Sequence, residues 1–349
     1  ACEHAIASLT VLDRLVIAAH KAGSQRITVV HFGRELKLNQ TYALGIEVQL
    51  LDKVPPIHTP TLLVAGNLVV QEKDLAQVIS NQGRLSTPNR EVLPCGVARV
   101  WKGDLNNSLP HLPKIRTNGV TQVVEDGLTA IQAEDALWDT MGLDTDSFVD
   151  RNFNRPVGRI ASKILIHTPV SPNVISIVAT TVGLLSAWYF SRGEAHLMIL
   201  GAVLLQLSAV IDCIDGDIAR ILHKETKAGK WLDLGGDQLV HLFLLAGIGV
   251  GLYRMAEQTG PTLWLGIVAA LGVVLSFLTI LRAEQSKSPL PRLKIFLSKT
   301  TNRDFSVLLV VFAIVERVQW FLWIALLAVH VFWLYGAWLR RLDEQRQPQ

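Results

Sequence analysis

The sequence predicts an α-helical membrane protein with six transmembrane helices, an amphipathic juxtamembrane helix and an N-terminal soluble α/β domain. Up to about residue 150, segments typical of helices alternate with segments typical of strands. A basic amphipathic stretch follows, and from Val170 onward apolar runs approach the roughly 20 residues that cross a bilayer. We therefore expect a cytosolic domain over 1–145, the juxtamembrane helix over 146–168 and the membrane domain over 169–342.

Residues 1–145 carry the alternation that favours an α/β sheet domain. The helices expected there are Val11–Ala22 and Asp74–Asn81, and the expected strands are Arg26–His31, Thr61–Ala65 and Val97–Lys102. The net charge of +3 gives no indication of a nucleic-acid partner. The three cysteines form no evident disulfide framework, which suits a reducing cytosolic face, and we expect no cleavable signal peptide.

The membrane half contains six candidate spans: Val170–Phe190, His196–Ile221, Asp233–Tyr253, Thr262–Arg282, about Ser298–Val315, and Gln319–Leu339. Lys and Arg gather in the loop 222–232, in the connection 283–303 and at the C-terminus, whereas the alternate loops balance their charges. The positive-inside rule then places both termini and all three basic segments in the cytoplasm.

The fifth span is unusual because its apolar part, Phe305–Val315, is too short to cross a bilayer alone. Extending it toward the N-terminus includes the polar residues 300–304. A polar half-helix is tolerated at membrane depth where it lines a wet cavity or packs against protein. We expect it to line a cavity that opens to the cytoplasm.

The juxtamembrane segment Asp150–His167 has basic residues every four positions, at Arg151, Arg155, Arg159 and Lys163. Isoleucines lie between them. This pattern is typical of a helix that lies on an anionic leaflet.

Two pairs of carboxylates interrupt the apolar runs. Asp212 and Asp215 are three residues apart, and Asp233 and Asp237 are four apart, so on helices each pair shares a face. Ionisable residues at membrane depth are costly and usually functional, and four acids together need a cation or a proton. Hard divalent cations prefer carboxylate oxygens, so the first hypothesis is a site for Mg²⁺ or Mn²⁺. The alternative is a buried ion network with Arg220, Lys224, Lys227 and Lys230.

These acids belong to a spaced motif, D-x2-D-G-x2-A-R-x8-G-x3-D-x3-D, at Asp212, Asp215, Gly216, Ala219, Arg220, Gly229, Asp233 and Asp237. The motif resembles the signature of the CDP-alcohol phosphotransferase family, and Ser171-Pro172-Asn173 is similar to the element that opens the family's first transmembrane helix. The resemblance covers about residues 150–340. Small residues at Gly216 and Ala219 allow a base or phosphate to approach, Arg220 can donate to phosphate oxygens, and Gly229 permits the turn between two helices.

The resemblance implies a reaction and a role for each acid. Asp212, Asp215 and Asp233 are expected to bind the metal, and Asp237 to act as general base while also touching it. The implied reaction is attack by an acceptor hydroxyl on the β-phosphorus of a CDP-alcohol, with CMP leaving. The nucleotide and phosphate site would include Gly216, Ala219, Arg220, Gly229 and Asn173. A homodimer is also expected from the family.

Some members of the family use a phosphorylated polyol as acceptor, such as inositol phosphate or glycerol phosphate. A basic rim suits such an acceptor because Arg recognises phosphate well. The candidate rim residues are Arg155, Arg159, Arg282, Arg292, Lys294 and Arg303. Positive-inside topology explains the same residues equally well.

Three residues near the motif are expected to have no role in the site. Asp217 lies outside the motif and is expected to be a solvated or interfacial charge. His223 and His241 match no ligand spacing, and we interpret both as bystanders.

The run from Leu12 to Val30 is similar to cytidylyltransferases, in which a helix ends in Ala-Gly before the second strand. It resembles the N-terminal nucleotidyltransferase-like domain of inositol-phosphate cytidylyltransferase/di-myo-inositol-phosphate-phosphate synthase fusions. The glycine-rich nucleotide loop is absent, however, and Asn67 stands where a metal-binding Asp is expected. We therefore expect a degenerate domain without cytidylyltransferase activity. Two alternatives remain: a bifunctional enzyme that makes its own CDP-alcohol from CTP, and a non-enzymatic scaffold or transporter.

Overall fold

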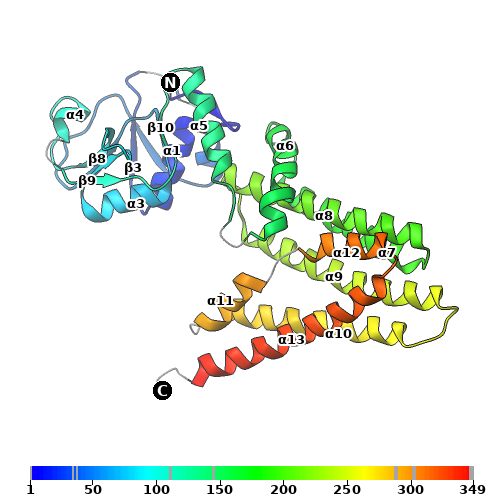
Figure 1. The fold of residues 1–349 in the computed structure, drawn as a ribbon. Coiled ribbons are helices and arrows are strands. Elements are labelled where there is room, and N and C mark those ends of the chain that lie inside the picture. The colour runs from blue at the N-terminus through cyan, green and yellow to red at the C-terminus, as the bar shows by residue number, and fades with distance from the viewer. Residues whose placement is uncertain are drawn as a thin grey trace. The chain divides into compact units, whose positions relative to one another are not determined.

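The computed structural model describes residues 2–33, 35–36, 38–109, 112–143, 146–286, 290–300 and 304–345. Contacts divide the chain into two compact units. The first unit is Ala1–Met141 with Ile221–His223, and the second is Gly142–Arg220 with Lys224–Gln349. The first unit mixes strands and helices, and the second is helical (Figure 1).

The first unit is an α/β domain. Its strands are β1 (Ala5–Ile6), β2 (Leu9–Thr10), β3 (Ile27–Val30), β4 (Val48–Leu51), β5 (Thr61–Val64), β6 (Leu68–Val70), β7 (Arg84–Ser86), β8 (Val92–Ala98), β9 (Lys114–Arg116) and β10 (Thr121–Val123). Its helices are α1 (Val11–Lys21), α2 (Asn39–Ala43), α3 (Glu72–Asn81), α4 (Leu105–Ser108) and α5 (Gly127–Asp139).

The largest sheet of this unit has four strands in the order β5-β8-β7-β9. β8 is antiparallel to both β5 and β7, and β7 is parallel to β9. Within the described residues there are also three two-stranded sheets: β3 parallel to β4, β6 antiparallel to β10, and β1 antiparallel to β2. Apolar side chains of α1 and α3 pack with those of β6, β7 and β8 in a buried core. The alternating pattern in the sequence is thus explained by helices that cover one side of short strands.

Most elements expected in this half are present within two residues of their predicted ends. The expected strand Val97–Lys102 is the exception. β8 starts earlier, at Val92, and ends at Ala98, so Arg99–Lys102 is not a strand. Pro94 lies inside β8, and a proline normally argues against a strand interior. The sequence pattern therefore did not indicate a strand that begins at Val92.

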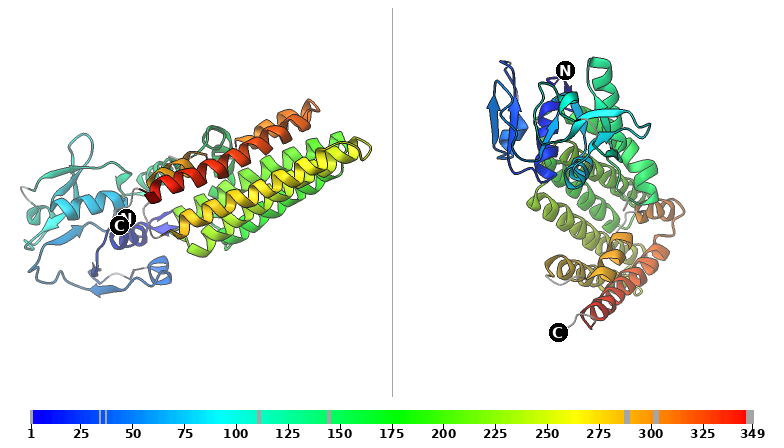
Figure 2. Two further views of the ribbon diagram at one scale, coloured as in Figure 1. Left: turned by 90° about the horizontal axis from the view of Figure 1, so that it is seen from below. Right: turned by 90° about the vertical axis from the view of Figure 1, so that its left-hand side faces the viewer.

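The second unit contains a π-helical turn and eight α-helices within its described residues: η1 (Asp150–Asn154), α6 (Arg155–Leu165), α7 (Pro172–Ser191), α8 (Ala195–Ile221), α9 (Lys227–Met255), α10 (Thr262–Gln285), α11 (Pro291–Thr300), α12 (Phe305–Ile314) and α13 (Val318–Gln345). Five of these helices are long and apolar enough to cross a membrane: α7, α8, α9, α10 and α13. They match five of the six predicted spans, and the chain is an integral membrane protein. Figure 2 shows these helices running along one another.

The sixth predicted span, about Ser298–Val315, does not form one long helix in the described residues. α11 ends at Thr300, α12 begins at Phe305, and residues 301–303 lie outside the description. α12 has 10 residues, about half the length needed to cross a bilayer. A sixth crossing therefore remains a prediction.

Glycines allow the long helices to approach closely. A Cβ on Gly247 of α9 would lie 2.5 Å from the carbonyl oxygen of Ala187 in α7. A Cβ on Gly249 would lie 2.6 Å from the Cα of Gly266 in α10. Small residues at such crossings bring backbones together where the lipid offers no hydrophobic driving force between helices. These contacts fix α7 and α10 against α9, which carries two of the motif acids.

The juxtamembrane segment forms η1 and α6. Val157, Ile160 and Ile164 of α6 are exposed, whereas Arg155 and Gly158 are buried. A Cβ on Gly158 would lie 3.2 Å from the carbonyl oxygen of Val210, so α6 packs against α8 at this glycine. The exposed apolar face is suited to the interface of a bilayer.

Candidate metal centre and active site

The motif acids lie on two helices joined by a tight turn. Asp212 and Asp215 are in the second half of α8, and Asp233 and Asp237 are in the first half of α9. Between the helices, His223 adopts a left-handed conformation with φ of 53°. Thr226 then caps α9, because its hydroxyl accepts a hydrogen bond of 2.9 Å from the backbone N–H of Gly229.

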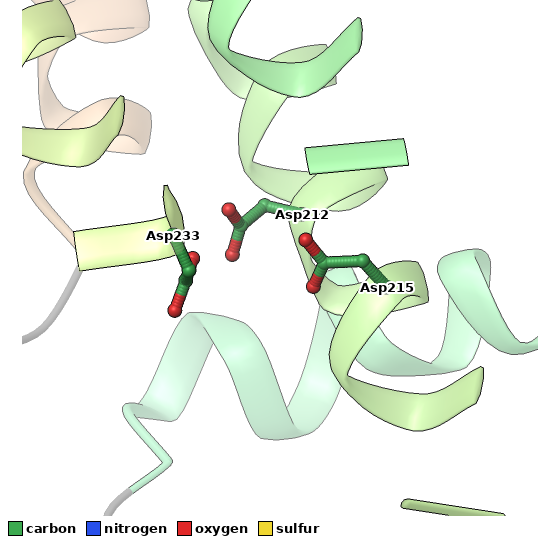
Figure 3. A group of neighbouring side chains, drawn as sticks. All are labelled: Asp212, Asp215 and Asp233. Atoms are coloured by element: carbon green, nitrogen blue, oxygen red, sulfur yellow. The ribbon is translucent and has the colours of Figure 1, made fainter. Parts of the chain in front are cut away.

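Three of the four acids converge. One carboxylate oxygen from each of Asp212, Asp215 and Asp233 lies within 4.8 Å of the other two. Figure 3 shows Asp212 and Asp215 projecting from one helix toward the space that Asp233 enters from another. Asp215 is buried and accepts a hydrogen bond from the hydroxyl of Ser176 in α7, and the other two are half-buried.

The arrangement of these three residues fits a divalent cation. Three carboxylates at this separation repel one another, and a low-dielectric setting strengthens that repulsion. A hard cation relieves it and prefers oxygen donors. The cluster therefore has the chemistry of a Mg²⁺ or Mn²⁺ site, with Ser176 holding one of the carboxylates in place.

Asp237 lies beside this group and lines a pocket that Asp212 also lines. The walls of the pocket come from four helices: Ala179 and Thr180 of α7, Leu205, Ser208 and Ala209 of α8, Val240 and His241 of α9, and Phe305 and Ser306 of α12. α12 thus contributes to the wall of the acid pocket. Thr300 and Asp304, the described residues of the polar half-helix, do not line this pocket, so the cavity-lining role expected for that half-helix stays a prediction.

His241 was expected to be a bystander, but it lines the same pocket as Asp237, one helical turn away. Its ring packs edge-on against Phe305, with 5.1 Å between the ring centroids. The i, i+4 spacing to Asp237 is the signal in the sequence that could have found it.

Gly229 has a different role from the one predicted. It lies inside the first turn of α9 and not in the connection between the helices. A Cβ there would be 3.0 Å from Oδ1 of Asn173 and 3.1 Å from Oγ1 of Thr226. The glycine therefore makes room for Asn173, which brings this expected nucleotide-site residue next to the start of α9.

Arg220 folds back over Gly216. A Cβ on Gly216 would lie 3.1 Å from Nη1 of Arg220 and 3.3 Å from its Nη2. Gly216 and Ala219 are both half-buried on α8. The small residue at 216 therefore accommodates the guanidinium group.

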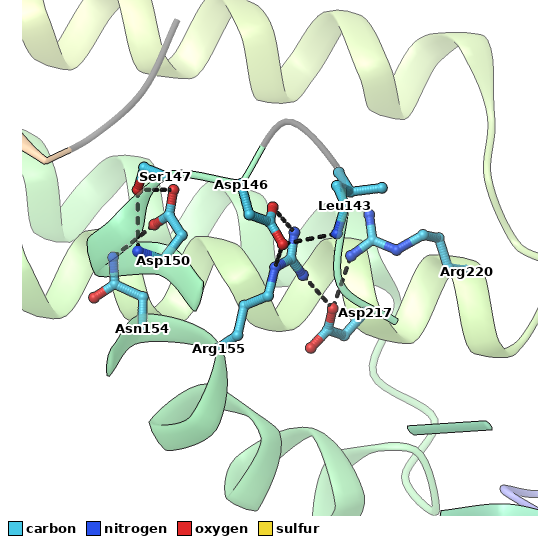
Figure 4. A network of polar contacts seen from close by, with 8 residues as sticks. All are labelled: Leu143, Asp146, Ser147, Asp150, Asn154, Arg155, Asp217 and Arg220. Carbon is cyan, nitrogen blue, oxygen red and sulfur yellow. Dashed lines mark hydrogen bonds and ion pairs between the residues drawn. The ribbon is translucent and has the colours of Figure 1, made fainter. Parts of the chain in front are cut away.

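Asp217 and Arg155 are both buried and paired with each other, contrary to the roles expected from the sequence. Asp217 is only 1% exposed, so the prediction of a solvated charge is wrong. Its Oδ1 accepts hydrogen bonds from Nη1 of Arg155 at 2.6 Å and from Nη2 of Arg220 at 2.7 Å (Figure 4). Arg155 is 8% exposed and also donates to both carboxylate oxygens of Asp146, so its place on an exposed basic rim is wrong as well.

Arg155 keeps its charge in this setting. Burial alone would lower its pKa, but its hydrogen bonds to Asp146 and the negative charge of Asp217 outweigh burial and raise the pKa. The protonation state of Arg155 is thus set by Asp146 and Asp217 and not by the basic stripe to which the sequence assigned it.

The other rim candidates are differently placed. Arg282 and Lys294 are exposed, Arg159 and Arg292 are half-buried, and Arg303 lies outside the described residues. A role for these residues in acceptor binding remains a prediction.

A second set of polar contacts ties α12 to the juxtamembrane segment. The amide of Asn154, which is fully buried, donates to Asp150 at 2.7 Å and accepts from Gln206 at 2.5 Å. Gln206 in turn accepts a hydrogen bond of 2.8 Å from Ser306, and the backbone N–H of Val149 donates to Asp304 at 3.0 Å. Sequence reasoning missed this ladder, because its members come from three separate segments.

Comparison with known proteins identifies the segment that holds the acids. Residues 169–333 match the family model described as CDP-alcohol phosphatidyltransferase. This segment belongs to that family. It contains the whole spaced motif from Asp212 to Asp237, so the resemblance inferred from the sequence is confirmed.

Curated relatives match parts of the chain. It is 34% identical over 109 residues to the bifunctional IPC transferase and DIPP synthase of Aquifex aeolicus, a match covering 31% of this chain and 24% of the relative. It is 32% identical over 97 residues to the archaetidylinositol phosphate synthase of Pyrococcus horikoshii, covering 28% of this chain and 50% of the relative. The matches thus span between about a quarter and a half of the length of these relatives.

Among solved structures, the chain is similar to the phosphatidylinositol phosphate synthase of Mycobacterium tuberculosis with CDP-DAG bound. The identity is 18%, the TM-score is 0.38, and the match covers 52% of this chain and 94% of that one. The same enzyme in complex with manganese and citrate matches at 19% identity with a TM-score of 0.37, covering 53% of this chain and 89% of that chain.

Proposed function

We propose that the protein is a membrane-embedded, metal-dependent enzyme that transfers a phosphoalcohol from a CDP-alcohol to a hydroxyl acceptor and releases CMP. The observation that carries this proposal is the convergence of Asp212, Asp215 and Asp233 beside the pocket that Asp237 lines, inside the segment that belongs to the CDP-alcohol phosphatidyltransferase family. The three carboxylates that gather within 4.8 Å of one another favour a shared divalent cation.

Each acid has a proposed part in the chemistry. Asp212, Asp215 and Asp233 would hold Mg²⁺ or Mn²⁺, which when bound supplies positive charge against the pyrophosphate of the donor. Asp237 stands outside this group of three and takes the proton from the acceptor hydroxyl. The acceptor oxygen forms a bond to the β-phosphorus while the bond from that phosphorus to the bridging oxygen breaks. CMP leaves with the electron pair of that bond.

The substrates follow from the relatives and the charge distribution. One relative is named an archaetidylinositol phosphate synthase, which favours a phosphorylated polyol acceptor such as inositol phosphate, with glycerol phosphate as the second candidate. Arg159, Arg282, Arg292 and Lys294 are the described residues proposed to bind the acceptor phosphate. The donor is a CDP-alcohol whose alcohol is either diacylglycerol or a soluble polyol.

The setting of the enzyme is proposed from the charge pattern and the family. We propose that the protein lies in the cytoplasmic membrane with both termini in the cytoplasm, because Lys and Arg concentrate in the loops next to the acids. We also propose that it is a homodimer, as the resemblance implies.

The N-terminal unit is proposed to be a nucleotidyltransferase-like domain without cytidylyltransferase activity. Asn67 supports this, because its side-chain amide donates a hydrogen bond of 3.0 Å to the carbonyl oxygen of Val124, and its backbone carbonyl accepts one of 2.9 Å from the backbone N–H of Val124. An amide used in this way links the start of β6 to the end of β10 and supplies no negative charge to a metal. Pyrophosphate release from CTP and inositol phosphate by the full chain would contradict the proposal.

The experiment that tests the proposed function measures CMP. Purified full-length protein in detergent is given CDP-diacylglycerol or CDP-inositol with inositol phosphate, glycerol phosphate or serine, in Mg²⁺ or in EDTA. At least one pair of substrates should give CMP in Mg²⁺ and none in EDTA.

Asp237→Asn should lower the rate of CMP release at least 100-fold, the lower range for loss of a general base. The matched control is Asp343→Asn in α13, a buried acid that accepts a hydrogen bond from the backbone of Leu293. Full activity of Asp237→Asn would remove this residue from the mechanism.

A further inference from the structure

We propose that Asp217, an acid outside the family motif, is the residue that positions Arg220 for the phosphates of the donor. This inference rests on the proposed function. It assigns Asp217 no contact with substrate; the carboxylate acts through the guanidinium group of Arg220.

The first step of the argument is the burial of Asp217. Its side chain is 1% exposed, and a carboxylate in such a place is stable only when paired. Figure 4 shows Arg155 and Arg220 reaching it from two sides. With Asp146 on the far side of Arg155, the four side chains form a series of alternating charges, Asp146–Arg155–Asp217–Arg220.

The second step concerns the hydrogen bonds that Arg155 makes to Asp217 and to Asp146. Its Nη1 donates to Oδ1 of Asp217 while its Nε and Nη2 donate to Asp146. Asp217 therefore has a second cationic partner, Arg155, which is buried and is itself held by Asp146. Asp217 is therefore held in place by Arg155 independently of its hydrogen bond to Arg220.

The third step is the position of Arg220. Its Nη2 donates to Asp217 at 2.7 Å, and its guanidinium lies over Gly216, where any Cβ would come within 3.1 Å. The Nε of Arg220 is buried and has no hydrogen-bond partner among the described residues. The Nη2 group of Arg220 is thus fixed by Asp217, and the other nitrogens of the guanidinium group can still donate to an anion.

The fourth step is the position of this arginine relative to the acids. Gly216 follows the metal-site residue Asp215 directly, and Arg220 covers it. An arginine held in advance by Asp217 loses less side-chain freedom when phosphate binds, which is the general benefit of preorganisation. Without Asp217 the guanidinium would have to be ordered by the substrate itself.

The test measures binding of CDP to the full-length protein in detergent with excess Mg²⁺, by isothermal titration calorimetry. Asp217→Asn should weaken CDP binding about tenfold, which corresponds to about 1.4 kcal/mol. Arg220→Gln should weaken it at least as much. In the double variant the two losses should not add, so that its Kd stays within about twofold of that of Arg220→Gln.

Two further variants separate positioning from mere stability. Asp146→Asn removes the other buried carboxylate of the series, which does not touch Arg220, and should leave the Kd for CDP within about twofold of the wild type. Asp217→Glu keeps the charge that Arg155 needs and should recover part of the affinity. Where CMP release is measurable, Asp217→Asn should raise KM for the donor and leave KM for the acceptor unchanged.

Several results would overturn the inference: additive losses in the double variant, an equal loss in Asp146→Asn, or an Asp217→Asn protein that binds CDP normally. If Asp217→Asn does not fold, an Arg220→Gln protein that binds CDP with the wild-type Kd would also overturn the inference, because Asp217 would then have no phosphate-binding residue to position. A wild-type protein that releases no CMP from any CDP-alcohol contradicts the proposed function instead. The two failures are therefore distinguishable.

Discussion

Asp233→Asn should stabilise the metal-free protein, although Asp233 belongs to the proposed metal site. Two unit charges at 4.8 Å, the largest separation in the three-acid group, repel by about 3.5 kcal/mol at an effective dielectric constant of about 20. Three such pairs amount to about 10 kcal/mol. The substitution removes two of them, about 7 kcal/mol at this dielectric constant.

Protonation limits the repulsion in the wild type. Placing a proton on a carboxyl with an ordinary pKa of about 3.9 costs about 4 kcal/mol at pH 7. In the metal-free wild type, protonation of one carboxyl costs less than the repulsion that it removes. The wild type would then keep one repelling pair of carboxylates, as the variant also does. The variant should therefore be more stable in EDTA by up to about 4 kcal/mol. At about 2–4 °C per kcal/mol, its unfolding temperature should rise by up to about 8–16 °C.

Addition of Mg²⁺ should make the wild type more stable than Asp233→Asn. A ligand present at 100 times its Kd stabilises the folded state by about 2.7 kcal/mol, and the wild type should gain this amount or more. Asp233→Asn has lost one of the three carboxylates and should gain little. The assay is thermal unfolding followed by tryptophan fluorescence in detergent, in EDTA and across a Mg²⁺ titration.

Asp343→Asn is the matched control for this experiment, because it removes a buried acid of the same unit that lies in α13. Its Mg²⁺-dependent gain should equal that of the wild type. The reasoning would be refuted by an Asp233→Asn protein that is less stable than the wild type in EDTA, or by one that gains as much from Mg²⁺.

One further prediction concerns the polar contacts of Asn154, and two concern Cys95 in the first unit. Asn154→Leu leaves Asp150 and Gln206 without the buried amide that joins them, and should lower the free energy of unfolding by about 1–3 kcal/mol, measured by thermal unfolding; an unchanged unfolding temperature would show that the ladder is not needed. In the first unit, burial raises the pKa of the Cys95 thiol to about 12 from its ordinary 9.0, so the folded state holds this proton more tightly. Stability should therefore be complete below pH 9 and fall as the pH rises toward about 12, more steeply than in Cys95→Ala. Native Cys95 should also resist N-ethylmaleimide at pH 8 when the modified residues are mapped by mass spectrometry, and rapid labelling without unfolding would contradict this.

The sequence was sufficient wherever local spacing determines geometry. The i, i+3 spacing of Asp212 and Asp215 placed both on one face of α8, and the apolar runs predicted the five long helices, although α9 begins six residues earlier and α13 ends six residues later than expected. The convergence of Asp233 on the first pair followed from a short connection between two helices. Local rules were enough for all of these features.

The sequence was insufficient where partners lie far apart in the chain. Asp217 looked exposed because it falls outside the motif, but Arg155, 62 positions earlier, buries it. Arg155 itself looked like one member of a regular basic stripe. Gly229 looked like a turn residue, whereas the close approach of Asn173 requires its small size. Tertiary contacts of this kind leave no periodic signal.

The central claim is that three carboxylates from two adjacent helices share a divalent cation. Anomalous X-ray scattering from crystals of the full-length protein grown with Mn²⁺ and CDP tests it most directly. The account predicts a manganese peak in contact with Asp212, Asp215 and Asp233. An active protein whose manganese peak lies away from these three side chains would contradict it.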